Sequence, residues 1–212
     1  MVEIEIWSDV MCPFCYIGKR KFESALQKFQ NKNQVKVVWK SYLLDPALVS
    51  DSSKSIHQHL ANSKGWTLDY AKEMSDYVSA MAKEVGLDYH MDQVKVANTF
   101  DAHRLIQLGK QKNKGDDMEE ALFKAYFTEG KNLADPEVLK AIASGIGIET
   151  EETEAMLKSK TLAKEVLEDL KAAEEIGVTG VPFFVFNRKF AVSGAQSPET
   201  FLNALKKAWE NE

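Results

Sequence analysis

Cysteine is scarce in this chain of 212 residues, which contains two, Cys12 and Cys15. Two cysteines cannot form the several disulfides that hold small secreted domains together, so that class is excluded. Long hydrophobic runs are also lacking, because no stretch approaches the roughly 20 apolar residues of a membrane-spanning helix. A basic excess is lacking too: the formal net charge is -5, which gives no general attraction to nucleic acid or to an anionic membrane. The one tight basic triplet, residues 19–21, is interpreted as a solvated helix face.

The composition that is present indicates a folded domain. Hydrophobic residues make up 44% and aromatic residues 10% of the chain, and a chain of this length can bury about 70% of the surface that its unfolded form exposes. Residues 1–7 contain acids where a secretory signal would carry basic residues. With Met1 as the native start, we expect a soluble, cytoplasmic protein. In that compartment a cysteine pair is usually reduced and is catalytic, redox-sensing or metal-binding.

The start of the chain has the pattern of an α/β protein. Val2, Ile4 and Ile6 alternate with polar residues, which predicts a strand. A helix is expected to open at Pro13, since proline suits the first helical position, and a second strand is expected over residues 34–43. A strand, a helix and a strand in this order predict a parallel pair with a right-handed crossover.

The middle of the chain differs from both ends. Residues 54–176 lack strand signals and contain helix-capping and helix-ending residues, with Asp116 expected to cap one helix. The α/β pattern then returns: the apolar run 183–186 predicts a buried strand, and residues 190–192 a returning hairpin strand. Ser197, followed by a proline, is expected to cap the final helix.

The two cysteines form a Cys-x-x-Cys motif between the first predicted strand and the first predicted helix, which is the setting of a dithiol redox motif. Their spacing places both sulfurs on one helix face, within reach of each other for a disulfide. Cys12 lies at the helix end where unpaired N–H groups and the helix dipole stabilise an anion, which favours its thiolate. We therefore expect Cys12 to attack and Cys15 to resolve.

Two other interpretations of the cysteine pair are open. A structural zinc site would need two further ligands, but there is no second cysteine pair. None of the four histidines has a spacing that completes such a site. An inert, buried pair is the other interpretation. We favour redox chemistry and expect no bound metal.

A second motif, Gly177-Val-Thr-Gly-Val-Pro-Phe183, comes immediately before the buried strand. With this motif, the chain resembles thioredoxin-fold proteins of the DsbA type. More narrowly, it resembles their FrnE-like cytoplasmic branch, whose members are often labelled dithiol–disulfide isomerases. The matching segments span nearly the whole chain in order: residues 8–19, 98–99, 102–105, 122–127, 180–182 and 193–196.

The resemblance implies an α/β, thioredoxin-like fold: a four-stranded mixed sheet with a large all-helical insertion between the second and third strands. It places the thioredoxin-like domain at residues 1–53 and 177–212 and the inserted helical subdomain at residues 54–176. Within the dithiol it makes Pro13 and Phe14 the central residues of the active-site motif.

The resemblance also implies a cis bond between Val181 and Pro182, in a loop that lies against the dithiol and exposes the Val181 backbone for strand-like pairing with a substrate. One position departs from thioredoxins, which carry a buried acid six residues before the first cysteine; here that residue is Ile6. Asp9 is the nearest acid, and a role in the loop or in capping is expected for it. The proton acceptor of Cys15 is left unassigned.

Asn98 and His103 lie in another matching segment. The helical spacing of His103 from Phe100 favours a hydrogen-bonded histidine in the core. The family pattern instead implies that Asn98 and His103 line the groove above Cys12. Both interpretations stay open at the level of the sequence.

The leading hypothesis is an enzyme, a DsbA-like thiol–disulfide oxidoreductase or isomerase. Its partners would be protein or peptide thiols and disulfides and an unidentified recycling reductant or oxidant. No cofactor is expected beyond the cysteine pair, with glutathione considered as a co-substrate. The alternative is a glutathione-dependent transferase or isomerase related to kappa-class glutathione transferases and 2-hydroxychromene-2-carboxylate isomerases. Those relatives typically have serine in place of the first cysteine, which counts against this alternative. A non-catalytic chaperone or complex subunit is the third hypothesis.

Overall fold

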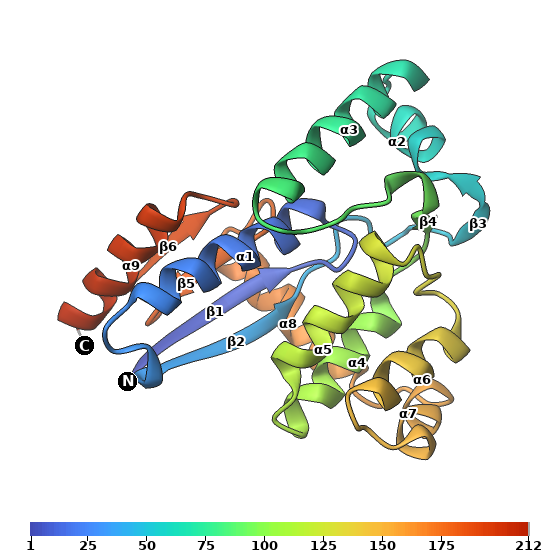
Figure 1. Cartoon of the computed structure of the whole chain (residues 1–212). Helices are drawn as coiled ribbons and strands as arrows, with labels where there is room; N and C mark the ends of the chain where they lie inside the picture. The colour runs from blue at the N-terminus through green and yellow to red at the C-terminus, as the bar shows by residue number, and fades with distance from the viewer. Residues whose placement is uncertain (212) are drawn as a thin grey trace.

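The structure is a computed structural model in which residues 1–211 are described. Its central element is a four-stranded sheet with the strand order β2-β1-β5-β6 (Figure 1). β1 and β2 are parallel, whereas β5 is antiparallel to β1 and β6 to β5. The four strands are β1 (Val2–Ser8), β2 (Val35–Ser41), β5 (Phe183–Phe186) and β6 (Phe190–Ser193). The four-stranded mixed sheet that the resemblance implies is therefore confirmed.

The helices of the chain lie mostly between β2 and β5. In order they are α1 (Pro13–Lys28), α2 (Ile56–Lys64), α3 (Leu68–Glu84), α4 (Phe100–Gln111), α5 (Gly115–Phe123), α6 (Pro136–Gly145), α7 (Thr150–Leu157), α8 (Ala163–Glu175) and α9 (Pro198–Glu210). Single turns join some of them: the 3-10 turns η1 (Lys32–Gln34) and η2 (Met91–Gln93) and the π-helical turn η3 (Lys124–Thr128).

The insertion is not helical throughout, which corrects the expectation from the sequence. It includes a two-stranded antiparallel sheet made of β3 (Asp51–Ser55) and β4 (Lys95–Val96). β3 consists of Asp-Ser-Ser-Lys-Ser and β4 has two residues. Neither segment has the alternation of apolar and polar residues by which a strand is predicted, so this sheet has no signal in the sequence.

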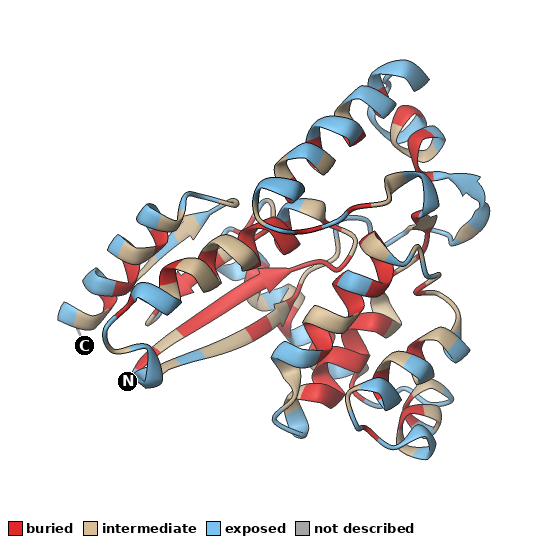
Figure 2. Ribbon diagram, viewed as in Figure 1, coloured by how far each residue is buried: buried red, intermediate tan, exposed pale blue. Residues whose placement is uncertain are grey.

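Helices cover both faces of the main sheet. Each strand contributes side chains to both faces, because alternate residues of a strand point to opposite sides. On the side of α1 and α9, the rings of Phe22 and Phe201 lie 5.5 and 4.5 Å from that of Phe184 in β5. On the side of α8, Trp7 of β1 is buried with Ala173. Figure 2 shows β1 buried along most of its length, as expected for a strand with a neighbour on each side. The end of this buried strand is where the dithiol lies.

The predicted cap at Ser197 agrees with the structure, and Asp135 is a further N-cap of the same kind. The side chains of Asp135 and Ser197 accept hydrogen bonds from backbone N–H groups two and three residues further on, at 2.9 and 3.2 Å. Both residues therefore act as N-caps. Asp116 does not, because α5 begins one residue earlier and its N-cap is Lys114. Asp116 instead lies in the first turn, where the helix dipole favours a negative charge.

The division at residues 54 and 177 stays a prediction, because α8 links both parts. Its Asp169 accepts a hydrogen bond from Lys40 of β2 at 2.8 Å, and its backbone carbonyl accepts one from the Trp7 indole at 3.0 Å. In the chain, α8 belongs to the insertion. In space it packs on the sheet, as Figure 1 also shows.

Candidate active site

The dithiol lies where β1 ends and α1 begins. Cys12 is the N-cap of α1, and Pro13 occupies the first turn, where the missing N–H of proline costs nothing. The backbone N–H of Cys12 donates to the carbonyl of Asp9 at 2.9 Å, and that of Cys15 donates to the carbonyl of Cys12 at 3.0 Å. Both thiols are free and are in hydrogen-bond contact with each other. The predicted helix start at the motif is confirmed.

The two sulfurs lie in different surroundings. Cys12 is 4% exposed and Cys15 is 1% exposed, while Phe14 between them is 38% exposed. Burial, then the hydrogen bond and charge of Cys12, raise the pKa of the Cys15 thiol well above its ordinary value; the Asp9 backbone and the Ser8 hydroxyl act in the opposite direction. Cys15 is therefore a neutral thiol at neutral pH. It can attack a disulfide only after a base has taken its proton.

The loop before β5 contacts the first cysteine. The bond between Val181 and Pro182 is cis, as the resemblance implies, and the Cys12 thiol donates to the Val181 carbonyl at 3.5 Å. The Pro182 carbonyl accepts a hydrogen bond from the backbone N–H of Gly194 at 2.8 Å. Gly18 of α1 makes room for this loop, because a Cβ at that position would lie 2.9 Å from Cγ of Pro182. Segments 169 residues apart thus meet at the dithiol.

Asp9 organises the loop that precedes the dithiol. Its carboxylate accepts hydrogen bonds from the backbone N–H groups of Leu44 at 2.8 Å and Met11 at 3.3 Å. It also accepts one from the Thr99 hydroxyl at 2.9 Å, and Nε2 of His103 lies 3.3 Å from the same carboxylate. Asp9 is 0% exposed, and a buried charge needs such partners. The loop role expected for Asp9 is confirmed.

His103 and Asn98 support the same region from the start of α4. His103 is 1% exposed and contacts Asp9, which is the environment of a hydrogen-bonded core histidine. The Asn98 side chain donates to the Leu48 carbonyl at 3.0 Å and accepts from the backbone N–H of Phe100 at 2.9 Å. Both residues therefore hold loops in place. A groove-lining role for Asn98 and His103 stays a prediction.

Tyr89 is a neighbour of the dithiol that the sequence did not indicate. Its hydroxyl donates to the Pro13 carbonyl at 2.8 Å, and its ring stacks on that of Phe127 at 4.6 Å and on that of Tyr16 at 6.1 Å. Burial and then the charge of Cys12 raise the pKa of Tyr89 above its ordinary value, so it keeps its proton and acts as a donor. Tyr89 lies 76 residues from Pro13 in an irregular connection, where no motif marks it.

An apolar hollow of about 350 Å³ lies beside the active-site loop. Its wall includes Met11 and Pro13 on one side and Phe127 on the other, and His59 and Lys64 also line it. Small-molecule pockets in proteins measure about 300 to 1,000 Å³, so this hollow is near the lower end of that range. It can receive a side chain or a small molecule against Met11 and Pro13, the residues on either side of Cys12 in the chain.

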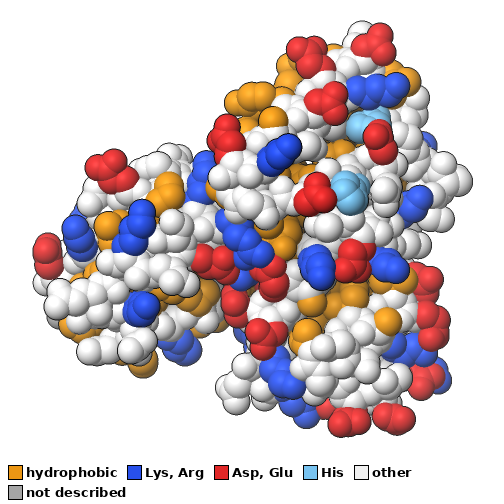
Figure 3. Space-filling model, in the orientation of Figure 1, with side chains coloured by type: hydrophobic (Ala, Val, Ile, Leu, Met, Phe, Trp, Pro, Cys, Tyr) orange, Lys and Arg blue, Asp and Glu red, His pale blue; other side chains and the backbone are white. Residues whose placement is uncertain are grey.

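The basic triplet at residues 19–21 is not a solvated face, which corrects that interpretation. Lys19 is 2% exposed, and its ammonium lies 3.3 Å from Asp116 and 3.2 Å from Glu120. Burial alone would lower the pKa of Lys19, but Asp116, Glu23 and Glu120 outweigh it and raise the pKa. Arg20 also pairs with Glu120. Acidic and basic side chains meet where α1 approaches α5 (Figure 3), and these ion pairs hold the two helices together.

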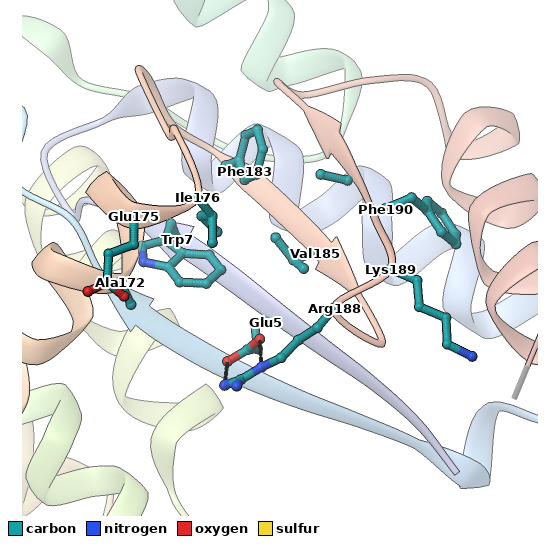
Figure 4. Close-up of a pocket in the computed structure, with 11 residues that line it drawn as sticks. Glu5, Trp7, Ala172, Glu175, Ile176, Phe183, Val185, Arg188, Lys189 and Phe190 are labelled. Carbon is teal, nitrogen blue, oxygen red and sulfur yellow. Dashed lines mark hydrogen bonds and ion pairs between the residues drawn. The ribbon is translucent and has the colours of Figure 1, made fainter.

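A second hollow, of about 330 Å³, lies on the sheet face toward α8. Figure 4 shows the Glu5 carboxylate and the Arg188 guanidinium facing each other there, joined by two hydrogen bonds of 2.8 Å. Glu5 is 4% exposed, and a buried carboxylate without a partner would be costly. The pair fixes the turn between β5 and β6 to β1. Neither cysteine lines this hollow.

Residues 1–211 contain neither a cluster of metal-binding side chains nor a helix that could span a membrane. No group of three or more histidine, cysteine, aspartate or glutamate side chains in this range is placed to hold a metal ion. In the same range, no helix is both long enough and apolar enough to cross a bilayer.

Comparison with known proteins agrees with this architecture. The family model described as a DSBA-like thioredoxin domain matches residues 3–206. The crystal structure of a probable DsbA oxidoreductase from Streptomyces coelicolor is 36% identical, covers 100% of this chain and 92% of its own, and has a TM-score of 0.95. An uncharacterized protein of Bacillus subtilis (strain 168), YwbO, is 27% identical over 212 residues and covers 96% of each chain.

A more distant structure is similar in fold. It is the cytosolic disulfide reductase DsbM from Pseudomonas aeruginosa with GSH, which is 14% identical, covers 98% of this chain and 99% of its own, and has a TM-score of 0.68. The expected thioredoxin-like fold with a helical insertion is confirmed by these similarities, while the narrower FrnE-like assignment stays a prediction. Because the family model covers nearly the whole chain, the protein belongs to the family of DSBA-like thioredoxin-domain proteins.

Proposed function

We propose that this protein is a thiol–disulfide oxidoreductase that exchanges disulfides with protein or peptide substrates. The observation that supports it most is the arrangement of three groups at the start of α1. Cys12 occupies the N-cap position of α1, its thiol donates to the Val181 carbonyl at 3.5 Å, and the Cys15 thiol lies one turn inside the helix. A structural cysteine pair would need no such contact with a second loop.

The reaction follows from the order of the two thiols. The Cys12 thiolate attacks a substrate disulfide, one substrate sulfur leaves as a thiolate, and a mixed disulfide joins Cys12 to the other. Cys15 then attacks Cys12 and releases the second sulfur, leaving an oxidised Cys12–Cys15 pair. The reverse sequence oxidises a substrate dithiol, and the redox poise of the compartment decides which direction dominates.

The substrate would bind across the Val181 loop. An extended peptide can pair with an exposed backbone, which gives affinity without a fixed side-chain sequence. The hollow beside Met11 and Pro13 would then receive an apolar side chain next to the substrate cysteine. Such a site favours unfolded or extended segments over folded surfaces, because only these can enter it in strand form.

Glutathione as a small co-substrate is the second candidate, and two observations favour it. The similar disulfide reductase from Pseudomonas aeruginosa has a structure with GSH. The hollow beside the dithiol is lined by His59 and Lys64, and a protonated ammonium group can pair with a carboxylate of a tripeptide. A glutathione-dependent transferase would use this hollow and Cys12 without any need for Cys15.

Two assays carried out side by side test the proposal. The first follows the reduction of insulin by dithiothreitol, with and without the protein, by the turbidity of the released B chain. The second measures conjugation of glutathione to an aryl halide. Disulfide exchange predicts acceleration of the first assay by the wild-type chain and none by Cys12→Ser or Cys15→Ser. Conjugation that survives Cys15→Ser, together with no insulin reduction, would contradict it and favour the transferase.

A further inference from the structure

Thiol–disulfide exchange by this dithiol needs a base for Cys15. The position at which thioredoxins carry a buried acid holds Ile6, which is 0% exposed and part of the apolar core. Asp9 is already engaged by two backbone N–H groups, a hydroxyl and a histidine. Tyr89 keeps its own proton. None of these groups is suited to receive the proton of Cys15.

A different buried carboxyl is connected to Cys15 through one hydroxyl. Glu119 of α5 is 1% exposed, and Oγ of Ser8, the last residue of β1, donates to its Oε1 at 2.7 Å. Ser8 is also 1% exposed, and hydrogen bonding by the same hydroxyl lowers the pKa of the Cys15 thiol. Ser8 thus lies between a thiol that must lose a proton and a carboxyl that can receive one. No water molecule is needed to carry the proton, since the side chains of Cys15, Ser8 and Glu119 are all buried.

The surroundings of Glu119 favour neither protonation state strongly. Its charged and titratable neighbours come from three helices: Lys19 of α1, His103 and Lys110 of α4, and Asp116 of α5. Burial has the largest effect and raises the pKa of Glu119 to about 7, against the Ser8 hydrogen bond and the charges of His103 and Lys19. A carboxyl that titrates near neutral pH is suited to accept a proton and later return it.

We propose that Ser8 and Glu119 form the proton relay of the resolving cysteine. This inference rests on the proposed disulfide exchange and adds to it the group that deprotonates Cys15. Glu119 acts through Ser8 and does not touch the reacting sulfurs. The acid that the main sheet lacks at Ile6 is thus supplied by the helical insertion.

In the mixed disulfide, the proton of Cys15 moves to Oγ of Ser8 while the hydroxyl proton of Ser8 moves to Oε1 of Glu119. The Cys15 sulfur attacks the Cys12 sulfur, the Cys12–Cys15 bond forms, and the bond from Cys12 to the substrate breaks. The electron pair goes to the substrate sulfur, which takes a proton from solvent. The protein dithiol loses two electrons and the substrate disulfide gains them.

The same relay operates in the opposite direction when the Cys12–Cys15 disulfide is reduced. Cys15 then leaves as a thiolate, and Glu119 returns the stored proton through Ser8. Resolution by Cys15 therefore requires the carboxylate form of Glu119, whereas reduction of the active-site disulfide is faster with the carboxylic acid form. The two directions should have opposite pH dependences, both centred near the pKa of about 7.

The test uses the reduced full-length chain and dithiobis(nitrobenzoate), a small aryl disulfide that needs no recognition. Attack by Cys12 releases a first coloured nitrothiolate, and resolution by Cys15 releases a second, so stopped-flow absorbance separates the two steps. In the wild type, the rate of the second step should rise with pH through an inflection near 7. In Glu119→Gln this inflection should disappear, and the second step should be about 100-fold slower at pH 8, since a positioned base contributes on the order of 10²-fold or more.

Two more variants separate the relay from effects on the fold. Ser8→Ala should slow the second step like Glu119→Gln, whereas Ser8→Thr, which keeps the hydroxyl, should restore most of the rate. Glu120→Gln is the matched control: it removes one carboxylate from the adjacent position of α5, where the side chain pairs with Arg20. It should keep the inflection near 7. Carbon-13 NMR of the glutamate carboxyls should show one group titrating near 7 that Glu119→Gln removes.

The relay is overturned if Glu119→Gln keeps the wild-type pH profile of the second step, or if Ser8→Thr is as slow as Ser8→Ala. Loss of the inflection in Glu120→Gln would also overturn it, because the pH dependence would then follow general charge. The proposed function fails separately, by the absence of insulin reduction in the wild type. If the wild-type protein reduces insulin but Glu119→Gln keeps the wild-type pH profile of the second step, the relay alone is refuted.

Discussion

The frame and the insertion contribute different chemistry to one site. The frame, made of β1, α1, β2, β5, β6 and α9, carries both cysteines and the Val181 carbonyl. The insertion, made of the elements between β2 and β5, supplies Thr99 and His103 to the loop before the dithiol, and Glu119 to Ser8. In our proposal the frame carries out the disulfide exchange, whereas the insertion holds the loop and accepts the proton of Cys15.

The two parts are also held together by different forces. In the frame, Phe22, Phe184 and Phe201 pack edge to face and at a tilt in an apolar core. In the insertion, Arg104 is 4% exposed and donates to backbone carbonyls, among them that of Ser159 at 2.7 Å. Apolar packing tolerates small shifts, whereas a buried charge loses much of its stabilisation when one partner is removed. Substitutions at the polar contacts should therefore lower the free energy of unfolding more than substitutions in the apolar core.

The largest expected effect lies in the frame. Cys12→Ser should abolish disulfide exchange, because the remaining thiol, Cys15, is buried and its pKa is raised. Cys15→Ser should instead accumulate mixed disulfides that cannot be resolved. Non-reducing gels and mass spectrometry of chains isolated from cells after acid quenching and alkylation would measure both. Equal trapping by the two variants would show that the roles of attack and resolution are not divided as proposed.

The next largest effect is expected for a substitution at Asp9, where the frame and the insertion are in contact. Asp9→Ala leaves the Leu44 N–H, the Thr99 hydroxyl and His103 without their acceptor. Breaking a buried charged contact costs about 3–5 kcal/mol, so the free energy of unfolding should fall by that amount. Urea unfolding followed by tryptophan fluorescence measures it.

Asp45→Ala is the control for Asp9→Ala, since the exposed Asp45 carboxylate accepts a hydrogen bond from the Ala47 N–H in the loop after β2 that also contains Leu44. It should change the free energy of unfolding by less than about 0.5 kcal/mol. If the two variants were equally stable, the Asp9 contacts would not hold the insertion to the frame.

Glu119→Gln should stabilise the protein in a pH-dependent way. The pKa of Glu119 is raised from 4.5 to about 7 on folding, so its contribution to stability is fully present below about pH 4.5 and is lost as the pH rises through 7. A shift of this size corresponds to about 3 kcal/mol. The advantage of Glu119→Gln should therefore grow between pH 5 and pH 8, as measured by urea unfolding at both values. An advantage independent of pH would mean that Glu119 does not titrate in this range.

The smallest expected effect concerns the packing of α1 against the Val181–Pro182 loop. In Gly18→Ala the new Cβ would lie 2.9 Å from Cγ of Pro182, which costs about 1–3 kcal/mol, partly offset by about 1 kcal/mol of better helix propensity. Turnover should fall as the Val181 carbonyl moves away from Cys12. Gly145→Ala, at the open end of α6, is the matched control and should be neutral or stabilising. Equal activity in both variants would show that the loop shifts without consequence.

Local patterns predicted much of the frame. The alternation of residues 2–7, the proline after Cys12 and the apolar run 183–186 each act within a few residues, so the strands and the start of α1 follow from them. The small sheet of β3 and β4 was missed because its residues have no apolar alternation. The burial of Lys19 was missed because its partners Asp116 and Glu120 are about a hundred residues away.

The sequence by itself determined the dithiol, its place at a helix start and the glycine and proline that shape the loop before β5, because these depend on spacing and backbone geometry over short distances. Only the tertiary structure decided which buried carboxyl accepts the hydrogen bond of Ser8. Ser8 and Glu119 lie 111 residues apart, and Tyr89 reaches Pro13 across 76 residues. No periodicity connects such pairs. Their contacts, and the pKa of Glu119 near 7, arise when folding removes them from water.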